Sequence, residues 1–333
     1  MFKKFNLYLF ANNTNITTDS GLTTEMKTFY SNYLITMAQP NLVHDQFGQK
    51  HPIPKNGGKT IEFRKYDSLG KAMTPLDEGV TPNGQKLTTT AITSEVKQYG
   101  GFIEMSDILL LTAIDNNLME ATRLLAAQAG RTLDRITCEV INAGKNVQYA
   151  EGQASGRSAL VGGADTGNCY LTVDAVRKAV RTLKVQNAEK INGNYVGIIH
   201  PDCAYDLMSD PKWVNVKTYS DPDGIYEGEI GKIEGVRFVE TSEAKVWKGA
   251  GSGSRDVYST LILGANAYGV TEVSGGGLEH IVKQLGSAGT ADPLNQRATA
   301  GWKATKCAEI LCDPYMVRIE TTSSFGEIPE EKY

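Results

Sequence analysis

The chain has 333 residues, a hydrophobic fraction of 41% and a formal net charge of -4 at pH 7. This apolar content is enough to bury a core and excludes a wholly disordered chain. No apolar run reaches the roughly 18 residues that a membrane-spanning helix needs. The charge gives no sign of the basic face that is typical of proteins binding duplex nucleic acid, and the length predicts about two domains.

The N-terminal half begins with segments of different character. Residues 1–20 are rich in Asn and Thr and are expected to form an extended arm, and apolar residues three or four apart predict a helix over residues 23–38. Runs rich in Thr, Ile and Phe then predict strands at 59–67 and 86–96, with Gly and Pro between them. This pattern indicates a long β-hairpin.

The hairpin has little apolar surface of its own. The apolar residues that alternate along its two strands are only Ile61, Phe63, Ile92 and Val96. A two-stranded ribbon with so few apolar residues is marginal alone in water. We therefore expect it to lean on another surface, either of the same chain or of a neighbouring subunit.

Helical periodicity follows the hairpin. Ser106 is a candidate cap for a short helix, and the strongest helical pattern runs from 116 to 143, with Gly144 as its expected C-terminal stop. A helix of that length is expected to be a strut that spans a domain. The Gly- and Ser-rich stretch 151–170 is a candidate domain boundary.

The remaining sequence predicts an α/β arrangement. Thr172 is expected to cap an amphipathic helix, and Pro201 is expected in the first turn of another helix, directly after a buried strand. Strands are predicted at 195–200, 235–241, 257–264 and 278–285, with two more within 298–322 that turn at Asp313-Pro314.

Motifs for catalysis or cofactor binding are weak. The segment IPKNGGKT (53–60) resembles a phosphate-binding loop but lacks the first glycine, and a strand rather than a helix is predicted after it. The five cysteines are scattered, and the spacing of Cys307 and Cys312 without a second pair does not suit zinc. We expect buried cysteines, no metal site and no cofactor.

His200 is the one histidine placed where catalytic residues are often found, at the end of a buried strand and before a helix. The same position suits a histidine that caps the end of the strand, and we favour this structural interpretation. With no recognisable catalytic centre, the arm, hairpin, strut helix and α/β region suit a subunit of an assembly better than an enzyme.

Six stretches carry a resemblance to a known family. They are PNLVHDQFGQKHPIPKNGGKTIEFRKY (40–66), LDEGVTPNGQ (76–85), AAQAGRTLDRITCEVINAGKNVQYA (126–150), VRKAVRTLKVQNAEKINGNYVGIIHPDCAYDLMSD (176–210), EGEIGKIEGVRFVETSEAKV (227–246) and GSAGTADPLNQRATAGWKATKCAEILCDPYMVRIE (286–320). Taken in their order along the chain, these stretches resemble the major capsid proteins of tailed bacteriophages. The group that they resemble is the N-four-like major capsid family. The motif GSAGTADPLNQRATAGWKA is specific.

The resemblance implies an α+β chain with the Hong Kong 97-type phage capsid fold. That fold has an N-terminal arm, an extended β-hairpin loop, a long spine helix, and peripheral and axial domains. The implied boundaries are an arm at 1–50, an extended loop at 51–100, a peripheral domain at 101–170 with its spine helix at 116–143, an axial domain at 171–294, and return strands of the peripheral domain with a tail at 295–333. The resemblance also implies that the surface missing for the hairpin belongs to a neighbouring subunit.

The implied function is that of a major capsid protein without enzymatic activity. Copies would self-assemble into hexamers and pentamers of an icosahedral shell around packaged double-stranded DNA, which they contact weakly and non-specifically. The further implied partners are a separate scaffold protein, a portal, and decoration or stabilising capsid proteins, with no membrane. The implied location is the virion, after assembly in the cytoplasm of the bacterial host.

On the hairpin, we expect intersubunit contacts from Lys55, Lys59, Arg64, Lys71, Met73, Asp77 and Glu78. Two other functions stay open at the level of the sequence. One is another structural protein of the particle, such as a tail-tube or decoration protein; a tail tube would consist mostly of β-ribbons, against which the strut helix argues. The other is an α/β hydrolase that uses His200.

Overall fold

Two compact units make up the chain. The computed structural model describes residues 43–52, 59–66, 69–73, 75, 79, 81, 84–112, 117–150, 155–162, 169–213, 231–272, 278–287 and 293–325. The first unit includes residues 99–130 and 278–304, and the second includes 41–98, 131–277 and the residues from 305 onwards. The predicted arm and the predicted helix at 23–38 lie outside the described residues.

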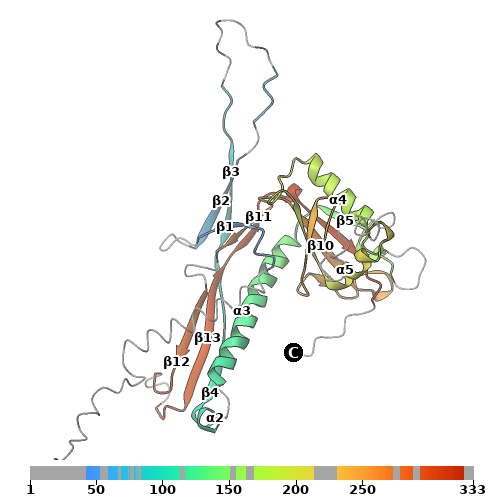
Figure 1. Ribbon diagram of the computed structural model, residues 1–333. Helices are drawn as coiled ribbons and strands as arrows, with labels where there is room; N and C mark the ends of the chain where they lie inside the picture. The colour runs from blue at the N-terminus through green and yellow to red at the C-terminus, as the bar shows by residue number, and fades with distance from the viewer. Residues whose placement is uncertain are drawn as a thin grey trace, which may run out of the picture. The chain divides into compact units, whose positions relative to one another are not determined.

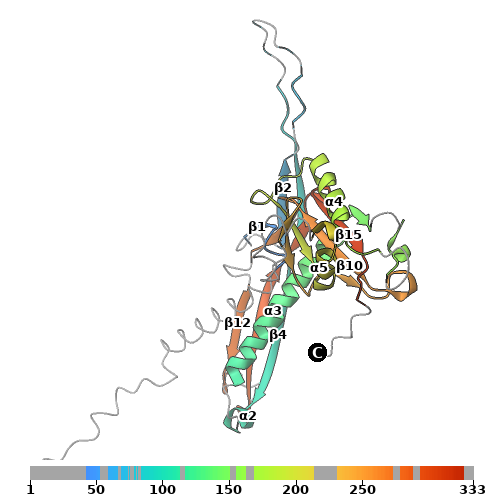
Figure 2. The same cartoon turned by 45° about the vertical axis from the view of Figure 1, so that its right-hand side comes forward.

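The first unit is built on a three-stranded sheet with the order β12-β13-β4. Its strands are β4 (Lys97–Ser106), β12 (Leu278–Lys283) and β13 (Arg297–Lys306). Figures 1 and 2 both show helix α3 running beside this sheet. On β13, the small residues Ala298, Ala300 and Ala304 are buried together with Trp302. The Nε1 of Trp302 donates a hydrogen bond to Oε1 of Gln128 on the helix at 3.0 Å. This bond fixes the helix and the sheet against each other.

Two helices follow β4 in the chain. The short helix α2 (Asp107–Thr112) begins where predicted, and the Oγ of Ser106 accepts a hydrogen bond from the backbone N–H of Leu109. The long helix α3 (Asn117–Ile141) confirms the strut predicted at 116–143, to within two residues at each end. In the described part of the chain, no helix is long and apolar enough to cross a membrane.

The second unit contains a mixed sheet with the order β5-β15-β10-β6-β8-β7, in which β9 also pairs with β10. Its strands are β5 (Val147–Tyr149), β6 (Tyr195–Ile199), β7 (Lys232–Ile233), β8 (Val236–Glu240), β9 (Val246–Trp247), β10 (Val257–Leu263) and β15 (Met316–Thr321). Every residue of β6 and β10 is buried, as their continuous apolar sequences predict. The predicted strands at 195–200, 235–241 and 257–264 are therefore confirmed.

The strand pairing differs from the domain boundary expected between residues 294 and 295. Strand β15 pairs antiparallel with β10, so residues 316–321 lie inside the α/β sheet. Conversely, β12 pairs with β13 in the sheet of the first unit. Each unit combines strands that are distant in the sequence. The two units therefore cannot be separated by a boundary at a single residue number.

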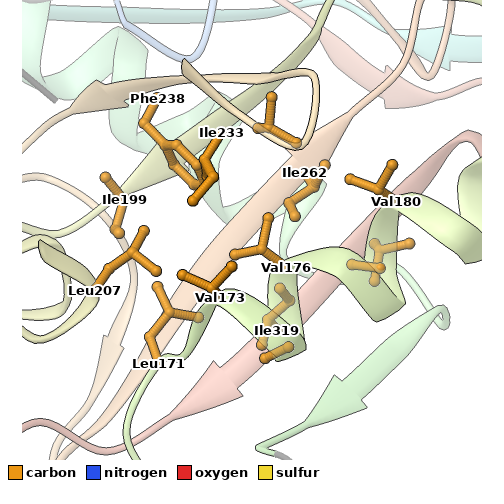
Figure 3. Close-up of a cluster of buried hydrophobic side chains, with 14 of the residues drawn as sticks. Leu171, Val173, Val176, Val180, Ile199, Leu207, Ile233, Phe238, Ile262 and Ile319 are labelled. Atoms are coloured by element: carbon orange, nitrogen blue, oxygen red, sulfur yellow. The ribbon is translucent and has the colours of Figure 1, made fainter. Parts of the chain in front are cut away.

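Helices α4 (Val173–Val185) and α5 (Pro201–Met208) supply apolar side chains to the core of the second unit. Thr172 caps α4 as predicted, because its side chain accepts a hydrogen bond from the N–H of Ala175. Figure 3 shows Val173, Val176 and Val180 of α4 facing strand residues such as Ile262 and Ile319. Burial of this apolar surface supplies most of the favourable free energy of folding.

Smaller elements complete the second unit. Strands β1 (Gln49–His51), β11 (Tyr268–Thr271) and β14 (Ala308–Ile310) form a three-stranded sheet in the order β1-β11-β14, and β2 (Thr60–Tyr66) and β3 (Thr89–Glu95) form a separate two-stranded ribbon. The 3-10 turns are η3 (Arg157–Ala159), η4 (Ser252–Ser254) and η6 (Asp313–Tyr315). Turn η6 lies where the sequence predicted a turn at Asp313-Pro314.

Candidate intersubunit contact surface

The predicted hairpin is present as a regular antiparallel ribbon. Strands β2 and β3 pair over seven residues, from Thr60 opposite Glu95 to Tyr66 opposite Thr89 (Figure 1). The N–H of Val96 donates to the carbonyl of Lys59 at 2.8 Å and closes the ladder at its root. The two strands predicted at 59–67 and 86–96 are therefore confirmed.

The root of the hairpin packs on its own chain. Ile61 and Phe63 are 6% and 0% exposed, and they form one apolar cluster with Cys307 and Leu311. Ile92 and Val96 pack against the same cluster. The expectation that the hairpin finds its missing surface on a neighbouring subunit is thus wrong for the root, because four described apolar residues find their partners within the subunit.

The part of the hairpin beyond the ladder has a different character. Leu69, Met73 and Leu87 are 57%, 81% and 60% exposed. Within this part, the side-chain amide of Gln85 donates to the carbonyl of Gly70 at 3.0 Å and links the two arms. Large apolar side chains that stay exposed to water forgo the free energy that burial would provide, so such a group of side chains indicates a contact surface.

The four expected contact residues that the structure describes fall into two groups. Lys59 and Arg64 are exposed on the root, where Arg64 forms a 3.0 Å ion pair with Glu62. Lys71 and Met73 are exposed beyond the ladder. The other three, which are Lys55, Asp77 and Glu78, lie outside the described residues. The described members thus point into solvent along the length of the ribbon.

Sequence reasoning missed Leu69 and Leu87, since it singled out mostly charged residues. The available signal was the presence of large apolar residues in a segment otherwise rich in Gly, Pro and polar residues, where no core explains them. It also missed a second set of exposed apolar side chains, in the first unit. These are Phe102, Ile108, Leu109, Leu124, Ile281, Leu285 and Leu294.

A family model described as phage capsid protein matches residues 89–309, which is more than half of the 333 residues. The chain belongs to this phage capsid protein family. No curated protein sequence matches the chain significantly. Membership rests on a span that includes β3, the long helix α3 and most of the α/β sheet, which are elements of both units.

Solved capsid structures share the fold of this phage capsid protein. The capsid of Ralstonia phage GP4 matches with a TM-score of 0.66 at 14% identity, over 82% of this chain and 86% of that chain. The capsid of cyanophage Pam1 matches with a TM-score of 0.64 at 15% identity, over 86% and 92%. The capsid of cyanophage P-SCSP1u matches with a TM-score of 0.61 at 13% identity, over 84% and 87%. The predicted α+β fold of the Hong Kong 97 type is therefore confirmed.

Family and fold together make the chain a major capsid protein, as the resemblance implied. His200, the residue on which the hydrolase alternative rested, has a structural task in this capsid protein. Its Nδ1 accepts a hydrogen bond from the N–H of Asp202 at 3.2 Å and caps helix α5. Burial lowers the pKa of His200, an effect that the Asp202 carboxylate opposes. The neighbouring Cys203 is fully buried, which raises the pKa of its thiol and disfavours the nucleophilic thiolate.

A buried polar cluster fixes the segment that precedes the hairpin. His44 and Asp45 are both buried, and each finds a partner from another element. His44 contacts Asp134 of α3 through both its ring and its backbone N–H, while Asp45 pairs with the Nζ of Lys306 and accepts a hydrogen bond from Thr137 at 2.5 Å. The cluster joins the segment to α3 and to the end of β13.

Proposed function

We propose that this capsid protein builds a closed icosahedral shell, in which copies form hexamers and pentamers and the hairpin beyond its root contacts a neighbouring copy. The exposed apolar residues of that part carry the proposal. Leu69, Met73 and Leu87 have no core of their own, and they project from a ribbon whose root is held by the subunit. A contact that buries them gains free energy without ordering the root.

The charged residues on the same ribbon suit the rim of such a contact. Lys59, Arg64 and Lys71 are exposed, and rim charges mainly determine the register and the rate of association. We assign the same role to Lys55, Asp77 and Glu78. Because a closed shell repeats each contact many times, every single contact can be modest and the shell can still be stable.

The remaining parts of the proposal follow from the shell. The protein acts mechanically, without catalysis, and contacts packaged double-stranded DNA weakly, in keeping with its net charge of -4. The first unit corresponds to the peripheral domain and the α/β sheet to the axial domain. A separate scaffold protein, a portal and decoration proteins are the further partners, and the shell assembles in the host cytoplasm before it becomes part of the virion.

Removal of the exposed part of the hairpin tests the contact. The full chain is expected to form closed particles that light scattering and negative-stain microscopy detect, in a phage lysate or together with its scaffold. A variant that lacks residues 68–84 should fold, since the root cluster is intact, but should not close shells. A triple variant, Leu69→Ser, Met73→Ser and Leu87→Ser, should show the same defect.

A matched control tests whether the assembly defect is specific to the hairpin or follows from the loss of any exposed apolar side chain. Val185 is 62% exposed at the end of α4, so Val185→Ser removes a comparable apolar side chain from another place. This variant should assemble normally. Normal shells from both hairpin variants would refute the proposed contact, and an equal defect in Val185→Ser would show that the hairpin has no special role.

A further inference from the structure

Phe63 fills a space that only a glycine leaves open. Its side chain is 0% exposed, and it lies against Gly269 of β11. A Cβ at position 269 would lie 2.5 Å from Cε1 and 2.7 Å from Cδ1 of the Phe63 ring, which is closer than real side chains approach. Gly269 is not among the glycines with positive φ, so the requirement is one of space rather than of backbone conformation.

Both strands of the hairpin contact the same row of paired residues in the sheet β1-β11-β14. In that row, Gly269 pairs with Gln49 on one side and with Glu309 on the other. Phe63 of β2 covers the glycine, while the Oγ of Ser94 on β3 donates to Oε2 of Glu309 at 3.0 Å. The ribbon is therefore attached at two points, one apolar and one polar.

A third contact sets the orientation of the ring. His51 of β1 meets Phe63 edge-on, with ring centroids 4.8 Å apart and planes at 87°. His51 itself is fixed, since its carbonyl accepts a hydrogen bond from the N–H of Glu272 at 2.9 Å and β1 pairs with β11. The ring is thus confined on two sides by elements of its own subunit.

We propose that the contact between Phe63 and Gly269 fixes the direction of the hairpin relative to the sheet β1-β11-β14 of its own subunit. The root enters assembly already fixed, and the neighbouring copy is contacted by exposed side chains beyond the root, such as Leu69, Met73 and Leu87. This inference rests on the proposed function of the hairpin and adds how its direction is set. Phe63 and Gly269 are accordingly positioning residues, which themselves contact no other subunit.

Hydrogen–deuterium exchange on the purified full chain tests the device before assembly. Gly269→Ala should displace the ring and raise exchange of the paired amides in β2 and β3 by about tenfold or more, while amides of the central strands β6 and β10 keep their protection. Phe63→Leu should raise exchange at the same strands by leaving the space half empty. Gly84→Ala is the matched control, because nothing lies within 4 Å of a Cβ at that position.

A double variant separates positioning from general damage. In Gly269→Ala with Phe63→Leu, the smaller side chain gives the added methyl group its room, so protection of β2 and β3 should return towards that of the unchanged protein. Particles of each single variant should be irregular by electron microscopy, and those of the double variant should be closed and regular. Rescue would show that the two side chains compete for one space, whereas instability from any other cause would not be relieved by a second substitution that removes apolar atoms.

Three results would overturn the proposal. They are unchanged exchange in β2 and β3 of both single variants, an equal rise in β6 and β10, and a double variant no better than either single one. Failure of the intersubunit contact would look different. In that case the chain without residues 68–84 would assemble normally, while the exchange pattern of the Gly269 and Phe63 variants would still follow the proposal.

Discussion

Nδ1 of His44 lies 2.6 Å from Oδ2 of Asp134, in a place where both side chains are essentially closed to water. The backbone N–H of His44 reaches the other oxygen of the same carboxylate at 2.7 Å. Two hydrogen bonds thus tie residue 44 to helix α3, and the hydroxyl of Tyr268 donates a hydrogen bond to the carbonyl of His44. The chain is fixed here before it enters the hairpin.

The first prediction concerns alkaline pH. Burial alone would lower the pKa of His44, but hydrogen bonds with Asp134 and the Cys138 thiol outweigh it and raise the pKa to about 10. The charged ring therefore stabilises the fold fully below pH 6.5, and this contribution is lost as the pH rises towards 10. The other ionisable groups of the cluster are Asp45, Lys306 and Tyr268.

Thermal unfolding between pH 6 and 10 measures this effect. The unchanged protein should lose on the order of a few kcal/mol of stability across that range. His44→Gln should be less stable at pH 6 and should show a flatter pH dependence. If the two proteins had parallel pH profiles, the charge of His44 would have no part in stability.

The second prediction concerns the ion pair between Asp45 and Lys306, whose side chains are 9% and 0% exposed. Lys306→Met should cost about 3–5 kcal/mol, because it leaves the Asp45 carboxylate buried without its partner. Asp45→Leu combined with Lys306→Met should cost much less, since it leaves no buried charge unpaired. Urea unfolding of the three proteins gives the comparison, and a double variant worse than the single one would contradict this account.

The third prediction concerns the buried carboxylate of Glu320. Arg157 binds it through Nε and Nη2 at 2.8 and 2.7 Å, and its guanidinium lies 3.7 Å from the ring centroid of Trp247. Arg157→Lys keeps the charge but loses the paired hydrogen bonds and the stacking, so it should cost about 1–3 kcal/mol in urea unfolding. Arg64→Lys changes an exposed pair and should cost less than about 1 kcal/mol. Equal costs would contradict the argument.

The fourth prediction concerns Gly144, at the end of α3. The sequence predicts this glycine as the C-terminal stop of the helix, and it is not among the glycines with positive φ. A Cβ here would lie 2.6 Å from Cε of Met316 and 2.7 Å from Oδ1 of Asp313, so both side-chain ends would have to shift, although Oδ1 of Asp313 already accepts a hydrogen bond from the N–H of Lys145 at 2.9 Å. Gly144→Ala should therefore destabilise the protein by about 1–3 kcal/mol in thermal or urea unfolding. Gly70→Ala, which meets open space, should be neutral or slightly stabilising.

The sequence by itself determined the elements whose signal is local. The period of apolar residues gave α3 to within two residues, the cap at Thr172 placed α4, and the Thr-rich runs gave β2 and β3. For His200 the sequence favoured a structural role at the end of the strand, and the structure shows that its task is to cap helix α5, through the N–H of Asp202 two residues further on. Periodicity and capping depend on neighbours within one turn of the chain, so a single sequence contains them.

Only the tertiary structure decided what lies against what. The sequence shows that Ile61 and Phe63 need a surface, but not that Cys307, Leu311 and Gly269 supply it from more than 200 residues further along. The charged network of His44, Asp134, Asp45 and Lys306 is likewise invisible in the sequence. Such contacts depend on the spatial match of distant segments, and neither composition nor spacing records which buried group will meet which partner.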